Sequence, residues 1–563
     1  MNKIAVVSIL LETSPQALPL GGACVASALK KYLANRENHP EVRLLTFSME
    51  GNPAPETLAT RISEKIMGYN PDICCFSVYV WNREVFSRIA RHLKQKSKII
   101  IIAGGPEVTA SPESFFPDLI TGENLFDSVI TGEGEKTLPK VIESYIKTGK
   151  AERIYAGEAL LPEELTSPYL DGTIDPKEYG GVLWELARGC PFKCSYCYES
   201  KGKNTVSPFP MERLEAEIKL FKKQKIPQVF VLDPTYNGNK KRALEILRLI
   251  KENLPECFFY FECRSEFIDR EIARAFGKIN CSLQIGIQST NPETLASVNR
   301  SFNKADFVKK TGILNREGII FGFDLIYGLP KDNLEKFKES LDFAISLYPN
   351  HLEIFRLAVL PGTRLFDDSG KFGIEFMNKP PYLILRSPTF TSKDLEAAEK
   401  LARACDFFYS KGRAVPWFNS LLKLLKVKAS TFLEEFYRFM TEGKKDSGLN
   451  FHPGSLINSP ANFQLPHKEI EKYQVEFVCK ILDLKKLGKY KNLVTDIIRI
   501  NGAVSRITGE GEESILRLSY HPEKLLSPYS TDFKAFYSAF PQERCSVKII
   551  ETRQGPDYRI LKS

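Results

Sequence analysis

Short apolar segments alternate with amphipathic helical stretches over residues 1–150. The stretch at 83–94, for example, places Val85, Phe86, Ile89 and Leu93 on one face of a helix. The apolar segments that we predict as strands are Ile4–Leu11, Val42–Phe47, Asp72–Val80, Lys98–Ala103 and Ser128–Thr131. This alternation predicts a doubly wound parallel sheet, and such sheets bind ligands at the carboxyl ends of their strands.

A second series of strands and helices follows a stretch of weak periodicity at 151–180, which we predict as a linker. Helical stretches such as Met211–Lys223 separate its apolar segments. The predicted strands are Val182–Ala187, Gln228–Leu232, Phe258–Cys263, Ser282–Ile287, Ile319–Ile326 and Leu352–Val359. Six strand and helix units predict a partial (β/α)6 barrel over 181–375, with its chemistry at the carboxyl ends of the strands.

The pattern changes in the last part of the chain, 376–563. Ser392–Tyr409 and Trp417–Met440 are predicted as helices, and the remainder is mixed. We expect a mostly helical α+β accessory domain that caps the barrel mouth and shapes the substrate pocket. Tyr382, Trp417 and Phe418 are candidates to line that pocket, although aromatic core is the favoured interpretation of all three.

Composition places the chain among soluble globular proteins of several domains. Of 563 residues, 43% are hydrophobic and 26% are charged, and no run approaches the ~18 apolar residues of a membrane span. The apolar segment after Lys3 ends without a signal-peptide cleavage site, so we expect a cytoplasmic protein with no membrane partner. The net charge of +9 suits an anionic ligand but does not indicate nucleic acid.

Three cysteines at one strand end have the spacing of a metal site. Cys190, Cys194 and Cys197 follow the first predicted barrel strand within eight residues. Three thiolates on one loop can bind three irons of a [4Fe–4S] cluster and leave the fourth iron open. A structural zinc site needs a fourth ligand, which is not nearby.

With Tyr196 before the last cysteine, this Cys-x3-Cys-x2-Cys loop resembles the signature of radical S-adenosylmethionine (SAM) enzymes. The resemblance implies that the open iron chelates SAM and passes it one electron. The 5′-deoxyadenosyl radical that results removes hydrogen from an unactivated carbon.

Residues at the other strand ends are expected to bind SAM by the same resemblance. Glu262 suits ribose hydroxyls and Arg264 suits the SAM carboxylate. Asp233 stands where relatives often carry a Gly-Gly-Glu element, whose absence leaves that contact uncertain. The full predicted set is Tyr196, Asp233, Glu262, Arg264, Gln288, Ser289, Arg300 and Leu360.

The loops of the first sheet resemble those of the cobalamin-binding domain that precedes the barrel in cobalamin-dependent radical SAM enzymes. The resemblance covers about residues 1–375 and implies a flavodoxin-like (Rossmann-type) domain. Glycines in these loops let the backbone approach a ligand closely. The residues expected to bind cobalamin are Leu20, Gly21, Gly22, Ser77, Tyr79, Trp81, Gly104, Gly105, Gly132 and Glu133.

One departure from other cobalamin domains concerns the lower face of the cobalt. Those domains that ligate cobalt supply a His after the first strand, but the loop Glu12–Leu18 contains none. We therefore expect base-off cobalamin without a protein His ligand, and Tyr79 or Trp81 packed under the ring. The six histidines lie elsewhere: His39, His92, His351, His452, His467 and His521.

The favoured function is a methyltransferase that methylates an unactivated carbon of a small molecule or peptide, with an electron donor such as flavodoxin or ferredoxin. Oxidative cyclisation or ring contraction remains an alternative. A methylthiotransferase needs three more cluster cysteines in the first domain, where Cys24, Cys74 and Cys75 have the wrong spacing. A non-enzymatic corrinoid carrier leaves the cysteine loop without a purpose. The remaining cysteines are mostly expected to be buried.

Overall fold

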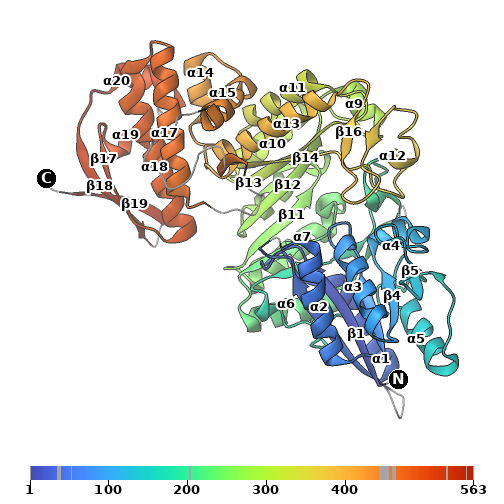
Figure 1. Ribbon diagram of the computed structural model, residues 1–563. Coiled ribbons are helices and arrows are strands. Elements are labelled where there is room, and N and C mark those ends of the chain that lie inside the picture. Colours follow the sequence, from blue (N-terminus) through green and yellow to red (C-terminus); the bar gives the residue numbers. More distant parts are fainter. Residues whose placement is uncertain are drawn as a thin grey trace.

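The computed structural model describes residues 2–34, 40–51, 53–201, 205–442, 456–458, 465–527, 531–552 and 555–561. A sheet domain, a barrel and a C-terminal region follow one another along the chain, and the end of the C-terminal region, with the strands over 514–561, lies away from the first domain (Figure 1). Within these ranges, no helix has both the length and the apolar character that crossing a membrane requires.

The first sheet consists of six parallel strands in the order β2-β1-β3-β4-β5-β6, which confirms the doubly wound prediction. Helices α1 (Leu20–Leu33) and α5 (Thr137–Thr148) pack on one face, whereas α2 (Pro55–Tyr69) and α3 (Arg83–Lys96) pack on the other. The short α4 (Pro106–Ala110) follows β4. The strands are β1 (Lys3–Leu10), β2 (Glu41–Ser48), β3 (Ile73–Ser77), β4 (Ile100–Gly104), β5 (Ser128–Thr131) and β6 (Ile154–Ala156).

Strand β3 ends at Ser77, three residues before the predicted end at Val80. The buried side chain of Asn82 explains the early end. Its amide donates to the carbonyls of Ser77 (3.2 Å) and Ile9 (3.1 Å), and its oxygen accepts from the backbone N–H of Tyr79 (2.8 Å). These hydrogen bonds take the place of further strand pairing by β3 and turn the chain over the edge of the sheet.

The segment 151–180, expected as a linker, contributes to the first domain instead. It supplies β6, which pairs with β5, and a three-residue strand is too short to show a period. Further along, Ser27 of α1 donates to Asp171 and is hydrogen-bonded to the hydroxyl of Thr166 (2.6 Å). The segment is therefore packed against α1, and the domain boundaries stay a prediction.

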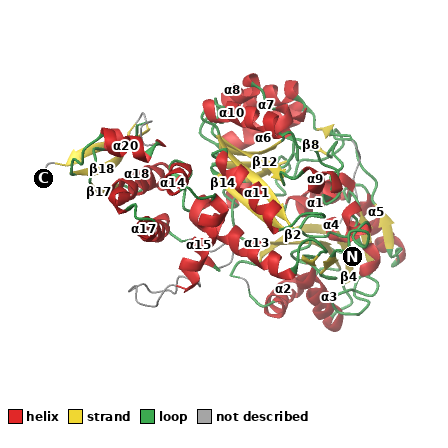
Figure 2. Ribbon diagram, turned by 90° about the horizontal axis from the view of Figure 1, so that it is seen from above, coloured by secondary structure: helices red, strands yellow, loops and turns green. Residues whose placement is uncertain are grey.

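The second sheet is an open barrel of six parallel strands in the order β14-β13-β12-β11-β10-β7. All six predicted strands are confirmed in position, and helices cover their outer side (Figure 2). The strands are β7 (Val182–Trp184), β10 (Gln228–Val231), β11 (Phe258–Cys263), β12 (Cys281–Gln288), β13 (Ile320–Tyr327) and β14 (His351–Arg356). The helices are α6 (Met211–Gln224), α7 (Lys240–Asn253), α8 (Arg270–Phe276), α9 (Pro292–Ser297), α10 (Lys304–Arg316) and α11 (Leu334–Ser346).

The C-terminal region is helical with an antiparallel sheet of three strands, as predicted for an α+β domain, and the short antiparallel pair β15 (Glu375–Phe376) and β16 (Ile384–Arg386) stands at its start. Its apolar core is continuous with that of the barrel, so the two parts pack as one body. Trp417 and Phe418 are buried in this core, as the favoured interpretation expected. The elements are α13 (Ser392–Cys405), α14 (Phe418–Leu425), α15 (Ala429–Glu442), α17 (His467–Leu484), α18 (Lys491–Glu510), β17 (Ser514–Leu518), α19 (Pro522–Leu525), α20 (Phe533–Ala539), β18 (Cys545–Thr552) and β19 (Gly555–Leu561).

Two helices predicted here as continuous are interrupted. The helix predicted over Trp417–Met440 is two helices, because Lys426 adopts a left-handed conformation with φ of 54° and ends α14. The helix predicted over Ser392–Tyr409 changes to a π-helical turn at Asp406–Ser410. No glycine or proline marks either position, so the sequence carried no signal for the change.

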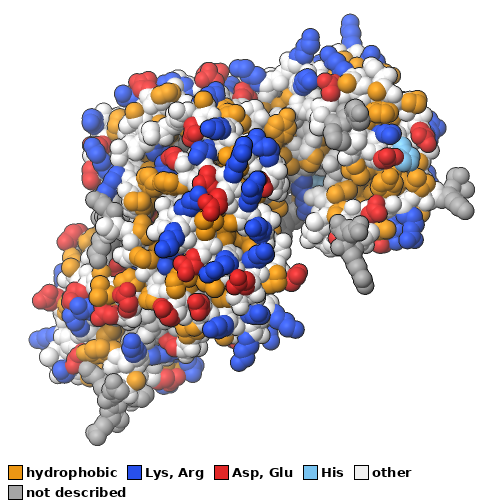
Figure 3. Space-filling view, turned by 180° about the vertical axis from the view of Figure 1, so that it is seen from behind, with side chains coloured by type: hydrophobic (Ala, Val, Ile, Leu, Met, Phe, Trp, Pro, Cys, Tyr) orange, Lys and Arg blue, Asp and Glu red, His pale blue; other side chains and the backbone are white. Residues whose placement is uncertain are grey.

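The surface mixes both signs of charge. Lys and Arg side chains are interspersed with Asp and Glu over the face drawn in Figure 3. Because the whole chain has 78 basic and 69 acidic residues, this mixture is what the modest net charge leads one to expect.

A buried carboxylate connects the first barrel strand to the segment before it. Glu217 of α6 is 1% exposed and accepts from Trp184 of β7 (2.8 Å), from Ser167 (2.6 Å) and from Arg213 (3.0 Å). One carboxylate therefore satisfies three donors from three segments.

We predict that Glu217→Ala lowers the free energy of unfolding by about 3 kcal/mol, because it leaves Arg213 and two other donors without their acceptor. Chemical unfolding of the purified protein measures the change. Glu215→Ala, which removes an exposed carboxylate from the same helix, is the matched control and should change stability by less than about 0.5 kcal/mol. Equal effects of the two substitutions would contradict the role of Glu217.

Candidate functional site

A cavity of about 690 Å³ lies at the carboxyl edge of the first sheet. All ten residues predicted to bind cobalamin line it, because the loops after β1, β3, β4 and β5 converge there. Four residues of the barrel complete the wall on the opposite side: Leu183, Glu185, Arg188 and Leu232. The cavity therefore lies between the two parallel sheets, at the edge where each is expected to bind its ligand.

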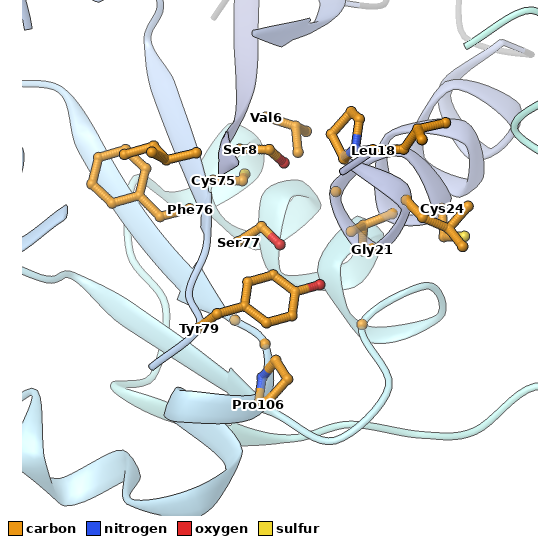
Figure 4. Close-up of a pocket in the computed structure, with 18 of the residues that line it drawn as sticks. Val6, Ser8, Leu18, Gly21, Cys24, Cys75, Phe76, Ser77, Tyr79 and Pro106 are labelled. Atoms are coloured by element: carbon orange, nitrogen blue, oxygen red, sulfur yellow. The ribbon is translucent and has the colours of Figure 1, made fainter. Parts of the chain in front are cut away.

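The inner part of this cavity has unfilled hydrogen-bonding capacity. Ser8 of β1 is 4% exposed, and its hydroxyl has no partner among the described residues. A Cβ placed on Gly22 would lie 2.2 Å from that hydroxyl, so only glycine leaves this space open. The hydroxyls of Ser8, Ser77 and Tyr79 are turned toward the start of α1 at Gly21 (Figure 4). An orphaned buried donor beside a space that only glycine leaves open fits the polar tail of a corrinoid.

An aromatic pair stands at the mouth of the cavity. Tyr79 and Trp81 stack with ring centroids 4.4 Å apart, and Trp81 donates to the carbonyl of Ile9 (3.3 Å). Trp81 is 41% exposed, so it is not a core residue. Among the residues that line the cavity there is no histidine; His39 and His452 lie outside the described residues.

The cysteine loop is held by its neighbours through backbone contacts. The N–H of Ser195 donates to Val298 (3.0 Å), the amide of Asn299 donates to Lys193 (2.8 Å), and the N–H of Leu365 donates to Ser195 (2.8 Å). None of the three cysteines forms a disulfide; Cys194 is buried, and Cys190 and Cys197 are partly exposed.

The thiol arrangement suits a cluster better than a single ion. Among the described residues, no three Cys, His, Asp or Glu side chains are close enough to hold one metal ion. A [4Fe–4S] cluster places each thiolate on a different iron, so its ligands need not meet at one point. Three thiols that are not in disulfides, on one supported loop, fit that requirement.

Several residues predicted to bind SAM surround the cysteine loop. Arg300 donates to the Tyr196 hydroxyl (3.1 Å) and to the carbonyl of Gly286 (2.8 Å). The guanidinium of Arg264 lies 3.7 Å from the ring centroid of Phe192, which is part of the loop. Both arginines therefore connect a barrel strand end to the loop.

Gln288, near this loop, has a side-chain oxygen that could accept a further hydrogen bond. It ends β12 with a φ of 66°, a conformation that costs energy for a residue other than glycine. Its side chain is 9% exposed, and its Oε1 has no partner among the described residues. An unfilled acceptor at the catalytic edge of the barrel fits a polar group of SAM, as predicted.

Three other predicted residues already serve the fold. One oxygen of Asp233 accepts from the N–H groups of Leu186 (2.9 Å) and Ala187 (3.1 Å), which ends β7 at Trp184 instead of at the predicted Ala187. Ser289 caps the backbone of Asn291 (3.2 Å). The carbonyl of Leu360 accepts from Thr363 within its own turn (2.7 Å).

Glu262 faces other carboxylates across the barrel strands. Burial, together with the nearby charges of Asp324 on β13 and Glu353 on β14, raises its pKa to about 7. Its neighbour in register, Gln284, donates to Asp324 and accepts from His351 (2.7 Å). A cluster of carboxyl groups with raised pKa values therefore lies inside the barrel.

Arg188, which the sequence analysis did not select, joins the two sheets. Its guanidinium contacts Glu133 (2.9 Å) and Glu135 (2.7 Å) of the first domain and Glu185 (3.0 Å) of the barrel. It stands two residues before Cys190, and that position was the available signal. Ser8 was also missed, although it is the one polar residue between Ile4 and Leu11.

The cavity and the cysteine loop thus define a two-cofactor protein, with a corrinoid domain in front of an iron–sulfur barrel. Comparisons with known proteins agree. Residues 8–142 match the B12 binding domain model, and residues 184–344 match the radical SAM superfamily model. The chain therefore carries both a B12-binding domain and a radical SAM domain, and together these domains imply a [4Fe–4S] cluster, SAM and cobalamin.

Several of the curated relatives are named as methyltransferases or methylases. The cobalamin-dependent radical SAM methyltransferase TokK of Streptomyces tokunonensis is 26% identical, over 55% of this chain and 50% of TokK. The hopanoid C-3 methylase of Methylococcus capsulatus is 23% identical, over 52% of this chain and 59% of that protein. The chain thus spans about half the length of these curated relatives.

Two solved structures share the fold. The cobalamin-dependent SAM radical enzyme OxsB with aqua-cobalamin has a TM-score of 0.53 at 16% identity, over 96% of this chain and 84% of OxsB. The methyltransferase TsrM of Kitasatospora setae has a TM-score of 0.51 at 15% identity, over 68% of this chain and 78% of TsrM. Both confirm the order of a Rossmann-like domain and a partial barrel.

We predict that Asp233→Asn weakens the dependence of stability on pH. Burial raises the pKa of Asp233 to about 7, so the folded state holds this proton more tightly than the unfolded chain does. Its contribution is therefore lost as pH rises from about 4 to about 7. Asparagine keeps the acceptor for both N–H groups but does not ionise.

Thermal unfolding between about pH 5 and pH 8 measures this effect. The Asp233→Asn protein should lose less stability over that interval than the parent. Glu256→Gln, which changes an exposed carboxylate, should follow the parent. Parallel curves for parent and Asp233→Asn would show that Asp233 does not titrate in this range.

Proposed function

We propose that the protein is a methyltransferase that adds a methyl group to an unactivated carbon. Its support is the arrangement of one cavity that fits a corrinoid beside one loop that fits an iron–sulfur cluster, joined by Arg188. When bound, the cluster and SAM supply a radical that takes hydrogen from carbon, and cobalamin supplies the methyl group.

The chain's own residues hold and orient these groups in the proposal. Cys190, Cys194 and Cys197 ligate the cluster, and Gln288 offers its free amide oxygen to SAM. Ser8 and Ser77 bind the polar tail of the corrinoid at the bottom of the cavity. Closure of the cavity by barrel residues keeps water from the reacting groups.

The lower face of cobalt is proposed to lack a nitrogen ligand from the protein. The loop after β1 has no histidine, and the aromatic pair Tyr79 and Trp81 is the group at the cavity mouth that is large enough to cover a ring face. Base-off binding would leave the lower position open and ease departure of the methyl group.

The methylthiotransferase alternative gains no support from the first domain. Cys74 and Cys75 are consecutive in β3, so their side chains point to opposite faces of the sheet. They cannot join Cys24 around one additional cluster. An electron donor such as flavodoxin or ferredoxin remains part of the proposal, since the cluster must be reduced.

We predict that the anaerobically reconstituted protein converts SAM to both S-adenosylhomocysteine and 5′-deoxyadenosine when a reductant is present. Mass spectrometry of the SAM products measures both. Cys194→Ala should lose iron–sulfur absorbance and 5′-deoxyadenosine, whereas the control Cys479→Ala, at a partly exposed cysteine on α17, should retain them. Deoxyadenosine without S-adenosylhomocysteine would instead support cyclisation or ring contraction.

We further predict that methylcobalamin bound to the protein has the absorption spectrum of the base-off form. Free methylcobalamin at neutral pH, in which the cofactor's own benzimidazole ligates cobalt, is the control. A nitrogen-ligated band in the bound form would contradict base-off binding without affecting the assignment of the cluster.

A further inference from the structure

A second cavity of about 810 Å³ adjoins the first. Leu11, Glu12 and Gln16, from the loop after β1, line both cavities and so form a shared wall. Much of the remaining wall comes from β14 of the barrel and from α13 with the π-helical turn that follows it. Six further residues complete it: Met49, Tyr327, Leu456, Ile457, Leu465 and Ile470. A ligand of this cavity would therefore lie next to whatever fills the first.

The C-terminal part of this wall is fixed in place. Ser410, the last residue of the π-helical turn, accepts from the N–H of Leu352 on β14 (3.0 Å), and Tyr409 donates to the carbonyl of Pro349 (2.6 Å). These bonds hold Asp406 and Phe407 at the cavity surface. The C-terminal region thus builds part of a binding site as well as a cover.

Large apolar side chains are left uncovered in this cavity. Leu11 is 57% exposed and Phe355 is 48% exposed, and both line the wall. Folded proteins bury such groups where they can, and a volume of this size is typical of sites for small organic ligands. The cavity is therefore suited to a ligand with an apolar body.

Both basic side chains of the wall have an acidic partner. Arg403 pairs with Glu399 (2.9 Å), and Lys411 pairs with Asp406 (2.9 Å). Glu353, at the middle of β14, is accessible from the cavity, and no described Lys, Arg or His pairs with it. Burial, together with the nearby charges of Asp324 and Asp406, raises its pKa to about 7. A cation at this position would relieve their repulsion.

We propose that this second cavity is the substrate site and that the substrate is an amphipathic organic cation. Its apolar body packs against Leu11 and Phe355, and its protonated amine or guanidine pairs with Glu353. The identification as a substrate rests on the proposed function; the ligand class rests on the cavity wall alone.

The test compares ligands that differ only in charge. Phenylbutylamine and phenylbutanol have similar shape, and calorimetric titration of the cobalamin-loaded, cluster-containing protein at about pH 8 keeps the amine protonated and Glu353 ionised. We expect the amine to bind at least about tenfold more tightly, since pairing with a charged group contributes about 1.5 kcal/mol or more. Equal affinities would overturn the proposal, and this comparison needs no variant.

Variants identify the carboxylate responsible. Glu353→Gln should abolish the preference for the amine, whereas Glu339→Gln, at an exposed position on α11, should retain it. Retained corrinoid content verifies that each variant is folded. A preference that survives Glu353→Gln would overturn the proposal.

A further comparison shows whether the cation can be part of a peptide, and measuring binding apart from turnover separates the ligand class from the proposed reaction. A short peptide with a lysine side chain, compared with its norleucine counterpart, shows whether a peptide-borne cation is accepted; tenfold preference for either cationic ligand supports the shared chemistry. Binding is measured without turnover. Failure of the charge preference therefore leaves S-adenosylhomocysteine formation intact, and failure of that reaction leaves the binding result intact.

Discussion

The contact on which the whole site depends is the guanidinium of Arg188, because it joins two sheets whose ligand-binding edges must face each other. Two of its carboxylate partners belong to the first domain and one to the barrel. The Arg188 side chain is 22% exposed and that of Glu135 is 9% exposed, so these charges have lost most of their water. Removing one partner from such a buried ion pair strongly destabilises a protein, because the other charge is left without a partner. The ion pairs of Arg188 therefore fix the position of one sheet relative to the other.

The sequence was sufficient for the architecture and for the lining of the first cavity. The predicted bounds of β5 and β11 are those observed, because each is a short apolar segment between clear turn signals. The ten predicted cobalamin residues converge because parallel strands must end at a common edge. Residues that are far apart in the sequence therefore lie together on one surface. This can be predicted from the order of strands and helices without knowing any side-chain contact.

What the sequence could not provide was the use of individual polar groups. Asp233 stands at a strand end like Gln288, but Asp233 caps two backbone N–H groups, whereas one atom of Gln288 stays unpaired. Ser8 and Arg188 were missed because their importance depends on distant partners. Strand β6 was missed because three residues carry no period, and the end of α14 because a lysine adopts the left-handed conformation.

The uncovered apolar side chains link the two cavities to the stability of the fold. Leu11 and Phe355 in the second cavity, and Trp81 in the first, are each more than one third exposed. Burial of apolar area contributes about 25 cal/mol of stabilisation per Å². The ligand-free protein lacks this contribution from the three side chains until ligands cover them. Because the ligands bind only the folded chain, they shift the folding equilibrium by mass action. A substitution at Leu11, in the shared wall, therefore changes ligand binding in both cavities and also the stability of the fold. The effect on binding can be separated from the effect on stability only when binding is measured on folded, corrinoid-loaded protein.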